Sequence, residues 1–450
     1  MNVQDKNITI VGLGRTAVAL AKLLLAKGAH PFVTESRGED DLGELPESLR
    51  AANVPFECGG HSDNAFDNAD IVVPSPGVSP TIPPIAQARA NSIEIVGEME
   101  VASHYIEAPM IAVTGTNGKT TTTALLHALI QRCGYRSVLA GNNDLPLSEV
   151  ALVDPAPDYV VVEVSSYQLE TCKTFHPWMA AVLNISNDHL ARHGTLENYA
   201  AVKSRIFINQ VESDIAVLNM DDPRCAAMGE GMSGQVVPFA QQSPMPEGMG
   251  IQDDHILWHG ETVAAFSDIP LPGQHNRENV LAALSLMRAG GFDWPHVIEG
   301  LRTFRGVEHR IEFVATIGGV TFYNDSKSTN LDSLRVALDS FEVPVILLAG
   351  GRGKGSDYGS IASQIQARVQ RIIAFGEDAE TIESAYAAIV PVERVESLTE
   401  AAEVAMRYAH SGDIILLSPA CASFDQYENF EARGHAFKTW VTQQAEAVSP

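Results

Sequence analysis

Residues 110–120 read Met-Ile-Ala-Val-Thr-Gly-Thr-Asn-Gly-Lys-Thr, and this stretch decides the fold of the central part of the chain. An apolar, largely β-branched run is followed by a glycine loop, by Lys119 and Thr120, and then by apolar residues at helical spacing. This order is typical of a P-loop, in which backbone N–H groups surround phosphates, the lysine reaches the β and γ oxygens, and the hydroxyl binds Mg²⁺. Val113 stands where the general pattern has its first glycine, so the loop is a variant.

Similar apolar runs recur on both sides of this loop and alternate with helical patterns. Such alternation predicts βαβ units and parallel sheets that are buried on both faces. The predicted strands are residues 8–11, 71–74, 110–114, 159–164, 180–185, 343–349, 371–375 and 413–417. Residues 255–266 differ, because two short runs flank a His-Gly-Glu turn, which predicts an antiparallel hairpin.

The length of the chain, 450 residues, indicates about three domains. We therefore predict an α/β fold with a Rossmann-like domain at residues 1–99 and a C-terminal Rossmann-like domain at residues 306–450. Between them, at residues 100–305, we expect a central P-loop ATPase domain with a parallel sheet and a small additional β region.

Composition limits the partners and the compartment. The formal net charge is -26, so most of the surface would repel nucleic acid. The five cysteines are scattered without a CxxC pair, which argues against disulfides and structural zinc. We see no signal peptide and no apolar stretch near the roughly 20 residues that span a bilayer. We expect a cytoplasmic protein without stable membrane insertion.

A second glycine turn, Gly12-Leu13-Gly14, follows the first predicted strand and opens a helix. Its pattern places a diphosphate at a helix N-terminus, and Glu35 at the end of the next strand could bond a ribose hydroxyl. From the residues alone, this turn could hold NAD(P), another nucleotide diphosphate or no ligand.

Acidic and imidazole side chains follow the strands next to the P-loop. Glu163 ends one strand, while Asp188 and His189 follow the next. The carboxyl ends of parallel strands share one edge of a sheet, so these residues are candidate ligands for the Mg²⁺ that accompanies bound phosphates.

Taken together, these motifs resemble the Mur ligase family, the cytoplasmic enzymes that build the peptidoglycan stem peptide. The matching segments, in family order over essentially the whole chain, are residues 114–120, 162–170, 184–189, 273–279, 309–310 and 324–327. The glycine turn at residues 12–14 and the segment at residues 418–434 are most similar to the branch that adds D-glutamate.

The resemblance implies ATP, UDP-N-acetylmuramoyl-L-alanine and D-glutamate as substrates. In that branch the first domain holds a UDP-sugar, so the resemblance replaces NAD at the first glycine turn. The implied contacts to the UDP-substrate are Arg15, Thr16, Glu35, Ser36, Arg37, Gly77, Asn142 and His189. The implied contacts to D-glutamate are Thr329, Lys354, Ser423, Phe424 and Phe430.

The family chemistry activates a carboxylate as an acyl phosphate, which an amine then attacks. The implied catalytic residues are Lys119, His189, Lys203 and Lys327. The implied ATP contacts are Gly115, Thr116, Asn117, Gly118, Lys119, Thr120, Thr121, Asn276, Asn279, His309, Arg310 and Asp325. Two Mg²⁺ ions are implied, and their ligands would be Thr120, Glu163, His189 and Lys203. Lys203 matches the lysine that takes up CO₂ as a carbamate; without the resemblance it would be interpreted as an exposed helix residue.

Two positions depart from the pattern of the best-known members. Ala191 lies where a second acidic residue is usual, and Arg352 lies where aspartate is common. Three alternatives stay open: another amide ligase such as a folate polyglutamate synthetase, an NAD-dependent oxidoreductase that uses the first glycine turn, and a non-catalytic nucleotide switch. We expect a monomer.

Overall fold

The computed structural model describes residues 1–79, 81–142, 145–188, 190–269, 271, 273–341, 343–353 and 355–448. The chain divides into two compact units. Unit 1 comprises Met1–Asp268 and Glu278–Arg302, and unit 2 comprises Ile269–Arg277 and Thr303–Pro450.

The first sheet of unit 1 has five parallel strands in the order β3-β2-β1-β4-β5. The strands are β1 Asn7–Val11, β2 His30–Thr34, β3 Phe56–Glu57, β4 Ile71–Pro74 and β5 Glu94–Ile95. The helices that follow them are α1 Arg15–Ala26, α2 Leu45–Ala51, α3 Asn64–Asp67 and α4 Pro83–Ala90. Strand β1 lies at the centre of this sheet, and four of its five residues, all apolar or threonine, are buried. The glycine turn follows the C-terminal end of this strand.

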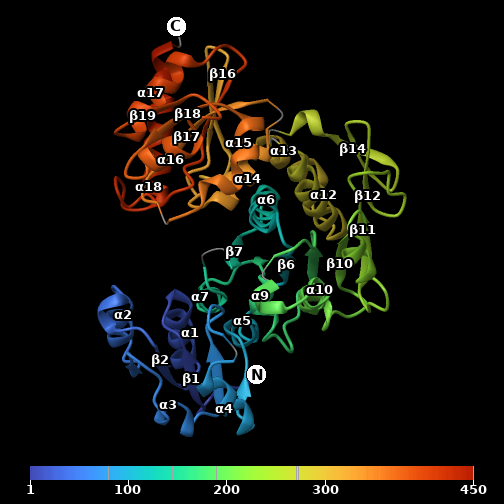
Figure 1. Cartoon of the computed structure of the whole chain (residues 1–450). Helices are drawn as coiled ribbons and strands as arrows, with labels where there is room; N and C mark the ends of the chain where they lie inside the picture. Colours follow the sequence, from blue (N-terminus) through green and yellow to red (C-terminus); the bar gives the residue numbers. More distant parts are fainter. Residues whose placement is uncertain are drawn as a thin grey trace. The chain divides into compact units, whose positions relative to one another are not determined.

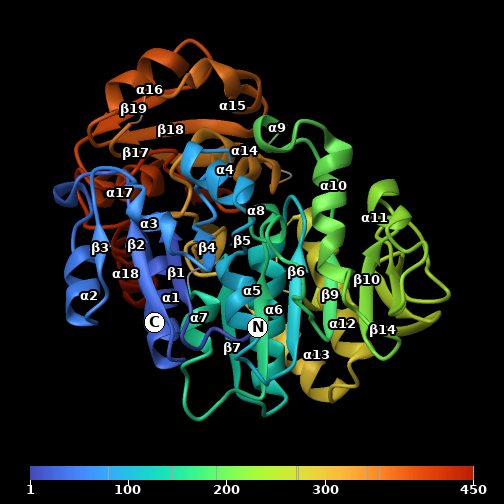
Figure 2. The ribbon, with the colours of Figure 1, turned by 90° about the horizontal axis from the view of Figure 1, so that it is seen from below.

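The second sheet of unit 1 has nine strands in the order β14-β13-β12-β11-β10-β9-β6-β8-β7. They are β6 Met110–Thr114, β7 Ser137–Gly141, β8 Tyr159–Glu163, β9 Met179–Val182, β10 Ile215–Asn219, β11 Gln235–Phe239, β12 Met249–Gln252, β13 His255–Trp258 and β14 Glu261–Ala265. Figure 2 shows β6, β9 and β10 side by side, and their pairing is parallel. The last three strands are antiparallel, which confirms the predicted hairpin.

Helices cover the central strands of this second sheet. They are α5 Glu98–Ser103, α6 Lys119–Arg132, α7 Leu147–Val150, α8 Ser166–Leu169, α9 Leu190–His193, α10 Leu196–Ser204, α11 Pro223–Ala227, α12 Gln274–Ala289 and α13 Trp294–Thr303. Residues of α5, α7 and α10 share one apolar cluster with β6 and β8, as Leu147 and Tyr199 do with Ala112 and Val162. The sheet is therefore buried by helices, and the P-loop leaves the carboxyl end of its strand β6.

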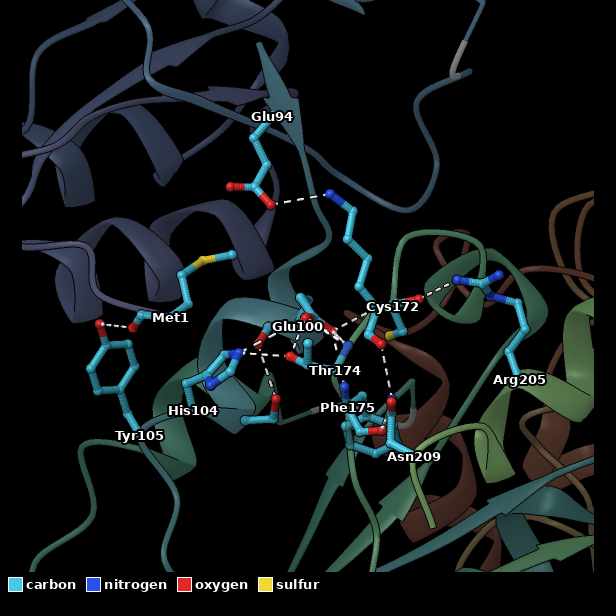
Figure 3. Close-up of polar contacts among 12 residues, drawn as sticks. Met1, Glu94, Glu100, His104, Tyr105, Cys172, Thr174, Phe175, Arg205 and Asn209 are labelled. Carbon is cyan, nitrogen blue, oxygen red and sulfur yellow. Dashed lines mark hydrogen bonds and ion pairs between the residues drawn. The ribbon is translucent and has the colours of Figure 1, made fainter. Parts of the chain in front are cut away.

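Glu100 of α5 joins the chain that follows the first sheet to the second sheet (Figure 3). Its buried carboxylate accepts the backbone N–H of Lys173 at 2.9 Å, of Thr174 at 2.9 Å and of Phe175 at 3.1 Å. Burial alone would raise the pKa of Glu100, but the hydrogen bond from the Thr174 hydroxyl and these backbone bonds outweigh it and lower the pKa. The Asn209 side-chain nitrogen donates to the carbonyl oxygens of Lys173 and Phe175. Both the N–H and the carbonyl groups of this segment are therefore hydrogen-bonded to side chains.

Unit 2 contains a six-stranded sheet in the order β15-β16-β20-β17-β18-β19. Its strands are β15 Glu312–Ile317, β16 Val320–Asn324, β17 Val345–Gly350, β18 Val369–Phe375, β19 Val392–Val395 and β20 Ile414–Leu417. Among the strand pairs of the described residues in this sheet, β15–β16 is antiparallel and the others are parallel. The helices are α14 Leu331–Asp339, α15 Ala362–Arg368, α16 Ala379–Tyr386, α17 Leu398–Tyr408 and α18 Phe430–Val448. Helices α14, α15 and α16 share one apolar cluster with the sheet, and α17 and α18 share another on the opposite face. Figure 1 draws these elements in orange and red.

The predicted α/β class, the parallel sheets and the additional β region are confirmed. The predicted strand at residues 180–185 is too long, because β9 ends at Val182. The residues beyond it leave the sheet to bond the P-loop instead, since the Asn184 carbonyl accepts the Thr116 N–H at 2.9 Å. The predicted domain boundaries at residues 99 and 305 stay predictions. Among the described residues, no helix is both long enough and apolar enough to cross a membrane.

Candidate functional site

The P-loop of unit 1 needs glycine at Gly118. This residue has φ +84°, and a Cβ placed on it would overlap the side-chain oxygen of Asn279. An L-residue at such a φ is also strained. Gly118 therefore lets the loop turn into α6 while Asn279 of α12 approaches the backbone.

Segment 184–186 fastens the loop at three points. The Asn184 carbonyl accepts the Thr116 N–H at 2.9 Å. The Asn184 side-chain oxygen accepts the Asn117 N–H at 2.8 Å. The Thr116 hydroxyl accepts the Ser186 N–H at 3.0 Å. The loop is thus shaped by the chain that leaves β9 as well as by its own glycines.

Two lysine side chains converge on the loop. Lys119 Nζ donates to the carbonyl oxygens of Gly115 at 2.9 Å and Thr116 at 2.8 Å. Lys203 Nζ, from α10, donates to the same Gly115 carbonyl at 2.8 Å and lies over the Tyr199 ring. Burial, followed by repulsion from Lys119, lowers the pKa of Lys203 to about 7.

Lys203 is 1% exposed. The interpretation of Lys203 as an exposed helix residue, which the local sequence favours, is therefore wrong. Its role as a carbamylated metal ligand stays a prediction. A lysine with a pKa near 7 carries a substantial fraction of neutral, nucleophilic amine at neutral pH.

Glu163 is the next candidate metal ligand in unit 1. The residue is 2% exposed, and its Oε1 accepts the Asn142 side-chain N–H at 2.9 Å. Its Oε2 is buried and has no hydrogen-bond partner among the described residues. A buried carboxylate oxygen is costly unless a donor or a cation meets it, so it fits an Mg²⁺ ion, whose usual ligands are hard oxygens. The Thr120 hydroxyl, in the first turn of α6, is an oxygen of the type that Mg²⁺ accepts, and its role as a ligand stays a prediction.

The first glycine turn is organised around Glu35, which is 4% exposed. Its carboxylate accepts the N–H of Leu13 at 2.7 Å and of Arg37 at 2.9 Å, and the Arg37 guanidinium lies 3.0 Å away. Burial would raise the pKa of Glu35, but these hydrogen bonds, with one from Ser36, lower it to about 2. The carboxylate therefore accepts hydrogen bonds from its own turn, and its contact with the UDP-substrate stays a prediction. Arg15, the first residue of α1, is exposed and pairs with Glu149.

The remaining predicted substrate contacts of unit 1 differ in exposure. Thr16 is half-buried, while Ser36 and Gly77 are exposed. His189 lies outside the described residues, as does the side chain of Ala191.

Unit 2 brings together most of the remaining candidates around the ends of β16 and β20. Asp325 is buried, accepts the Ser418 hydroxyl at 2.7 Å, and has its pKa raised to about 7 by burial. The Lys327 N–H donates to the His309 carbonyl at 3.0 Å, and Lys327 Nζ lies 5.6 Å from the centre of the Phe430 ring.

Other unit 2 candidates flank this group. Ser423 is 2% exposed and Phe424 is 63% exposed. Asn276 is buried, Thr329 is half-buried and Arg310 is exposed. Lys354 lies outside the described residues. Arg352, one of the two departures, pairs with Glu377 at 2.9 Å on the surface.

Arg433 links two loops that carry these candidates, and local sequence did not reveal it. The side chain is fully buried. Its Nε and Nη2 donate to the hydroxyl and carbonyl of Ser326, at 3.0 and 2.8 Å. Its Nη1 donates to the carbonyl of Cys421 at 3.0 Å. The loop after β16 and the loop after β20 are therefore held by one guanidinium.

Glu308, His309 and His435 lie close enough together to be considered as a metal site. Two contacts argue against it. Lys438 Nζ lies 2.6 Å from Glu308 Oε1 and forms an ion pair with this carboxylate. The Asn324 side-chain nitrogen lies 2.9 Å from His309 Nδ1, so a neutral ring carries its proton on Nε2, which removes the lone pair that would bind a metal.

The fold and the loop define a nucleotide-binding α/β protein of the P-loop class. Three family profiles match it: a Mur ligase MurD-like N-terminal domain at residues 6–97, a Mur ligase middle domain at residues 113–287 and a Mur ligase glutamate ligase domain at residues 309–421. The chain belongs to the Mur ligase family, whose members use ATP and Mg²⁺.

Two relatives are named UDP-N-acetylmuramoylalanine–D-glutamate ligase. The protein of Geotalea uraniireducens is 40% identical over 444 residues, 98% of each chain. That of Pelotomaculum thermopropionicum is 41% identical over 445 residues, 97% of each chain. Among solved structures, the UDP-N-acetylmuramate-alanine ligase of Thermotoga maritima is 20% identical with a TM-score of 0.60, and 97% of this chain and 99% of that chain are covered. A MurF ligase of Thermotoga maritima, in complex with ADP, is 16% identical with a TM-score of 0.55, over 93% and 96%. These two structures support the fold.

Proposed function

We propose that the chain is an ATP-dependent ligase that adds D-glutamate to UDP-N-acetylmuramoyl-L-alanine, in the cytoplasmic synthesis of peptidoglycan precursors. The observation that carries the activity is the group around the P-loop: the buried Lys203 beside Lys119, with a carboxylate oxygen of Glu163 left for a cation. The relatives of that name, similar over nearly the whole length, support the choice of substrates.

The proposed reaction activates a carboxylate that would otherwise be inert toward amines. An oxygen of the L-alanyl carboxylate attacks the γ-phosphorus of ATP, the bond to the β-phosphate oxygen breaks, and ADP leaves. The amine of D-glutamate then attacks the acyl carbon, the bond to the phosphate oxygen breaks, and one proton is released with inorganic phosphate. Positioning and neutralisation of several anions supply most of the rate.

The residues of unit 1 have distinct roles in this proposal. Lys119 leaves the loop carbonyls and neutralises the β and γ oxygens. Thr120 and Glu163 hold one Mg²⁺, which screens charge on the phosphates when it is bound. A second Mg²⁺ would be held by Lys203, as its carbamate, and by His189.

The environment of Lys203 supports the carbamate. The neutral amine attacks the carbon of CO₂, forming a C–N bond and releasing one proton. Because burial lowers the pKa to about 7, the reactive form is available at neutral pH. The product is an anion, which removes the repulsion between Lys203 and Lys119 and supplies hard oxygen ligands.

The other contacts are proposed as the sequence predicts them. For the nucleotide they are Gly115, Thr116, Asn117, Gly118, Lys119, Thr120, Thr121, Asn276, Asn279, His309, Arg310 and Asp325. For the UDP-substrate they are Arg15, Thr16, Glu35, Ser36, Arg37, Gly77, Asn142 and His189. For D-glutamate they are Thr329, Lys354, Ser423, Phe424 and Phe430, with Lys327 meeting charge at the reacting centre.

Phosphate release in the presence of UDP-N-acetylmuramoyl-L-alanine, with each amino acid added in turn, tests the proposal. Turnover with D-glutamate, and its loss in Lys119→Ala, is expected. Turnover with a folate substrate instead would identify another amide ligase. A nicotinamide absorbance change without ATP would favour an oxidoreductase, and ATP binding without amide formation would favour a switch. Light scattering after size exclusion tests the proposed monomer.

A further inference from the structure

Glu278 of α12 is a polar residue of unit 1 that the proposed function does not use. It directly precedes Asn279, whose side chain approaches Gly118 of the P-loop. We propose that Glu278 is a positioning residue that holds the P-loop in its nucleotide-binding form by orienting the side chain of Asn184. This inference rests on the proposed role of the loop in binding nucleotide.

The Asn184 carboxamide lies between Glu278 and the loop. Its Nδ2 donates to Glu278 Oε1 at 2.5 Å, and its Oδ1 accepts the Asn117 N–H at 2.8 Å. A carboxamide has a donor end and an acceptor end of nearly the same shape, whereas an ionised carboxylate only accepts. Glu278, together with the Asn117 carbonyl to which the same Nδ2 donates at 3.4 Å, therefore selects the orientation in which the amide oxygen accepts the Asn117 N–H.

Turning the Asn184 carboxamide around would be costly to the loop. The NH₂ group would then face the Asn117 N–H, and two donors would oppose each other. Asn117 is exposed at the tip of the loop, so few other contacts fix its backbone. The bond to Asn184 engages this N–H and so fixes the conformation of the loop, while the loop as a whole provides the backbone that surrounds phosphates in P-loop geometry.

The surroundings of Glu278 destabilise its ionised form. Burial, with repulsion from Asp222 and Asp221, raises the pKa of Glu278 to about 7, although hydrogen bonds from Asn184 and Asn219 act in the opposite direction. Because the folded pKa lies above the ordinary 4.5, the folded state binds the proton more tightly than the unfolded chain does. Folding stability therefore falls as the pH rises from about 4.5 to about 7, and the full cost is present above that.

Because the Glu278 charge lowers folding stability, a positioning role for this residue can be distinguished from a purely structural one. A residue that serves only the fold should destabilise the protein when it is replaced. A residue that costs stability but orients the loop should give a variant that is at least as stable and binds nucleotide less well.

The test measures binding of Mg–ADP by calorimetry at pH 8 to the full-length chain. Glu278→Leu removes the acceptor while filling similar space, so we expect affinity to fall about tenfold with an unchanged or higher melting temperature. Glu278→Gln keeps one acceptor oxygen, so its affinity for Mg–ADP should fall less. Glu299→Gln on α13, an exposed glutamate paired with Arg132, is the matched control and should bind normally.

A double-mutant cycle decides whether Glu278 acts through Asn184. Asn184→Ala combined with Glu278→Leu should bind Mg–ADP no more weakly than Asn184→Ala alone. Losses that add would overturn the inference, as would normal affinity of Glu278→Leu or a matching loss of melting temperature. If the unaltered chain bound no nucleotide, the proposed function itself would fail, which is a different result.

Discussion

The side-chain nitrogen of Lys203 lies 2.8 Å from the carbonyl oxygen of Gly115, so a lysine of α10 is hydrogen-bonded to the backbone of the P-loop. The approach brings two lysines to one carbonyl, because Lys119 Nζ donates to the same oxygen at 2.9 Å. Two ammonium groups at one oxygen repel each other, and the buried one is the easier to deprotonate. The phosphate site and the candidate carbamate are therefore electrostatically coupled.

Replacing Lys203 by methionine should stabilise the protein and inactivate it. The unfolded chain keeps the lysine proton up to about pH 10.5, whereas the folded chain gives it up near 7. The native lysine thus costs stability fully below pH 7, and this cost disappears as the pH rises from 7 toward 10.5. In CO₂-free buffer at pH 7 we expect Lys203→Met to raise the free energy of unfolding by about 3 kcal/mol, with a flatter dependence above pH 7.

Urea unfolding between pH 6 and 10 measures both effects. Lys22→Met, on the exposed side of α1, is the control and should leave the pH dependence unchanged. Identical pH slopes for Lys203→Met and the unaltered protein would contradict the low pKa. Retention of ligase activity would contradict the role of Lys203.

Gly118→Ala should abolish nucleotide binding. The new methyl group would overlap the Asn279 side-chain oxygen, and the φ of +84° is strained for alanine. Gly134→Ala is a matched control, because Gly134 has φ +89° with nothing near its Cβ position. It should lose about 1 kcal/mol of stability and keep normal affinity. Calorimetry with Mg–ADP separates the two, and equal affinities would show that Asn279 does not restrict the loop.

The sequence predicts those parts of the site that are local in the chain. The P-loop lies between β6 and α6 within one short stretch, and Glu163 ends the neighbouring strand, so spacing and strand ends suffice to find both. Burial of Lys203 could not be predicted in this way, since α10 has no clear apolar face and a lysine there is usually exposed.

Contacts between distant segments are the part that sequence reasoning missed. Glu278 and Asn184 are 94 residues apart, and Arg433 and Ser326 are 107 apart. Nothing in the local pattern of either member indicates its partner, because the pairing depends on how strands are ordered in each sheet. The early end of β9 has the same origin, since segment 184–186 bonds the loop instead of a neighbouring strand.

Glu35→Gln should destabilise the protein in a pH-dependent way. The pKa of Glu35 is about 2 in the folded state against an ordinary 4.5. The carboxylate therefore contributes stability that is fully present above pH 4.5 and is lost as the pH falls toward 2. We expect the free energy of unfolding to be about 2 kcal/mol lower at pH 7. This difference from the unaltered protein should narrow between pH 4.5 and 3.

Urea unfolding at pH 7, 4.5 and 3 checks this dependence on Glu35. Glu44→Gln, at an exposed position, should behave as the unaltered protein at each pH. The KM for the UDP-substrate should rise in Glu35→Gln, because the turn carries the proposed contacts Ser36 and Arg37. A gap that stays constant with pH would mean that the Glu35 charge does not stabilise the turn.

Arg433→Lys should weaken the use of D-glutamate more than it weakens the fold. The guanidinium places three N–H donors in a fixed plane, two toward Ser326 and one toward Cys421. A lysine keeps the charge but cannot meet all three acceptors from one nitrogen, so one of the two loops loses its tie. We expect kcat to fall at least tenfold and the KM for D-glutamate to rise, with a stability loss of roughly 1 to 3 kcal/mol. Arg407→Lys, on the exposed side of α17, is the control. Steady-state kinetics and urea unfolding measure the two effects separately, and a variant that lost stability while its KM for D-glutamate stayed normal would show that Arg433 serves the fold alone.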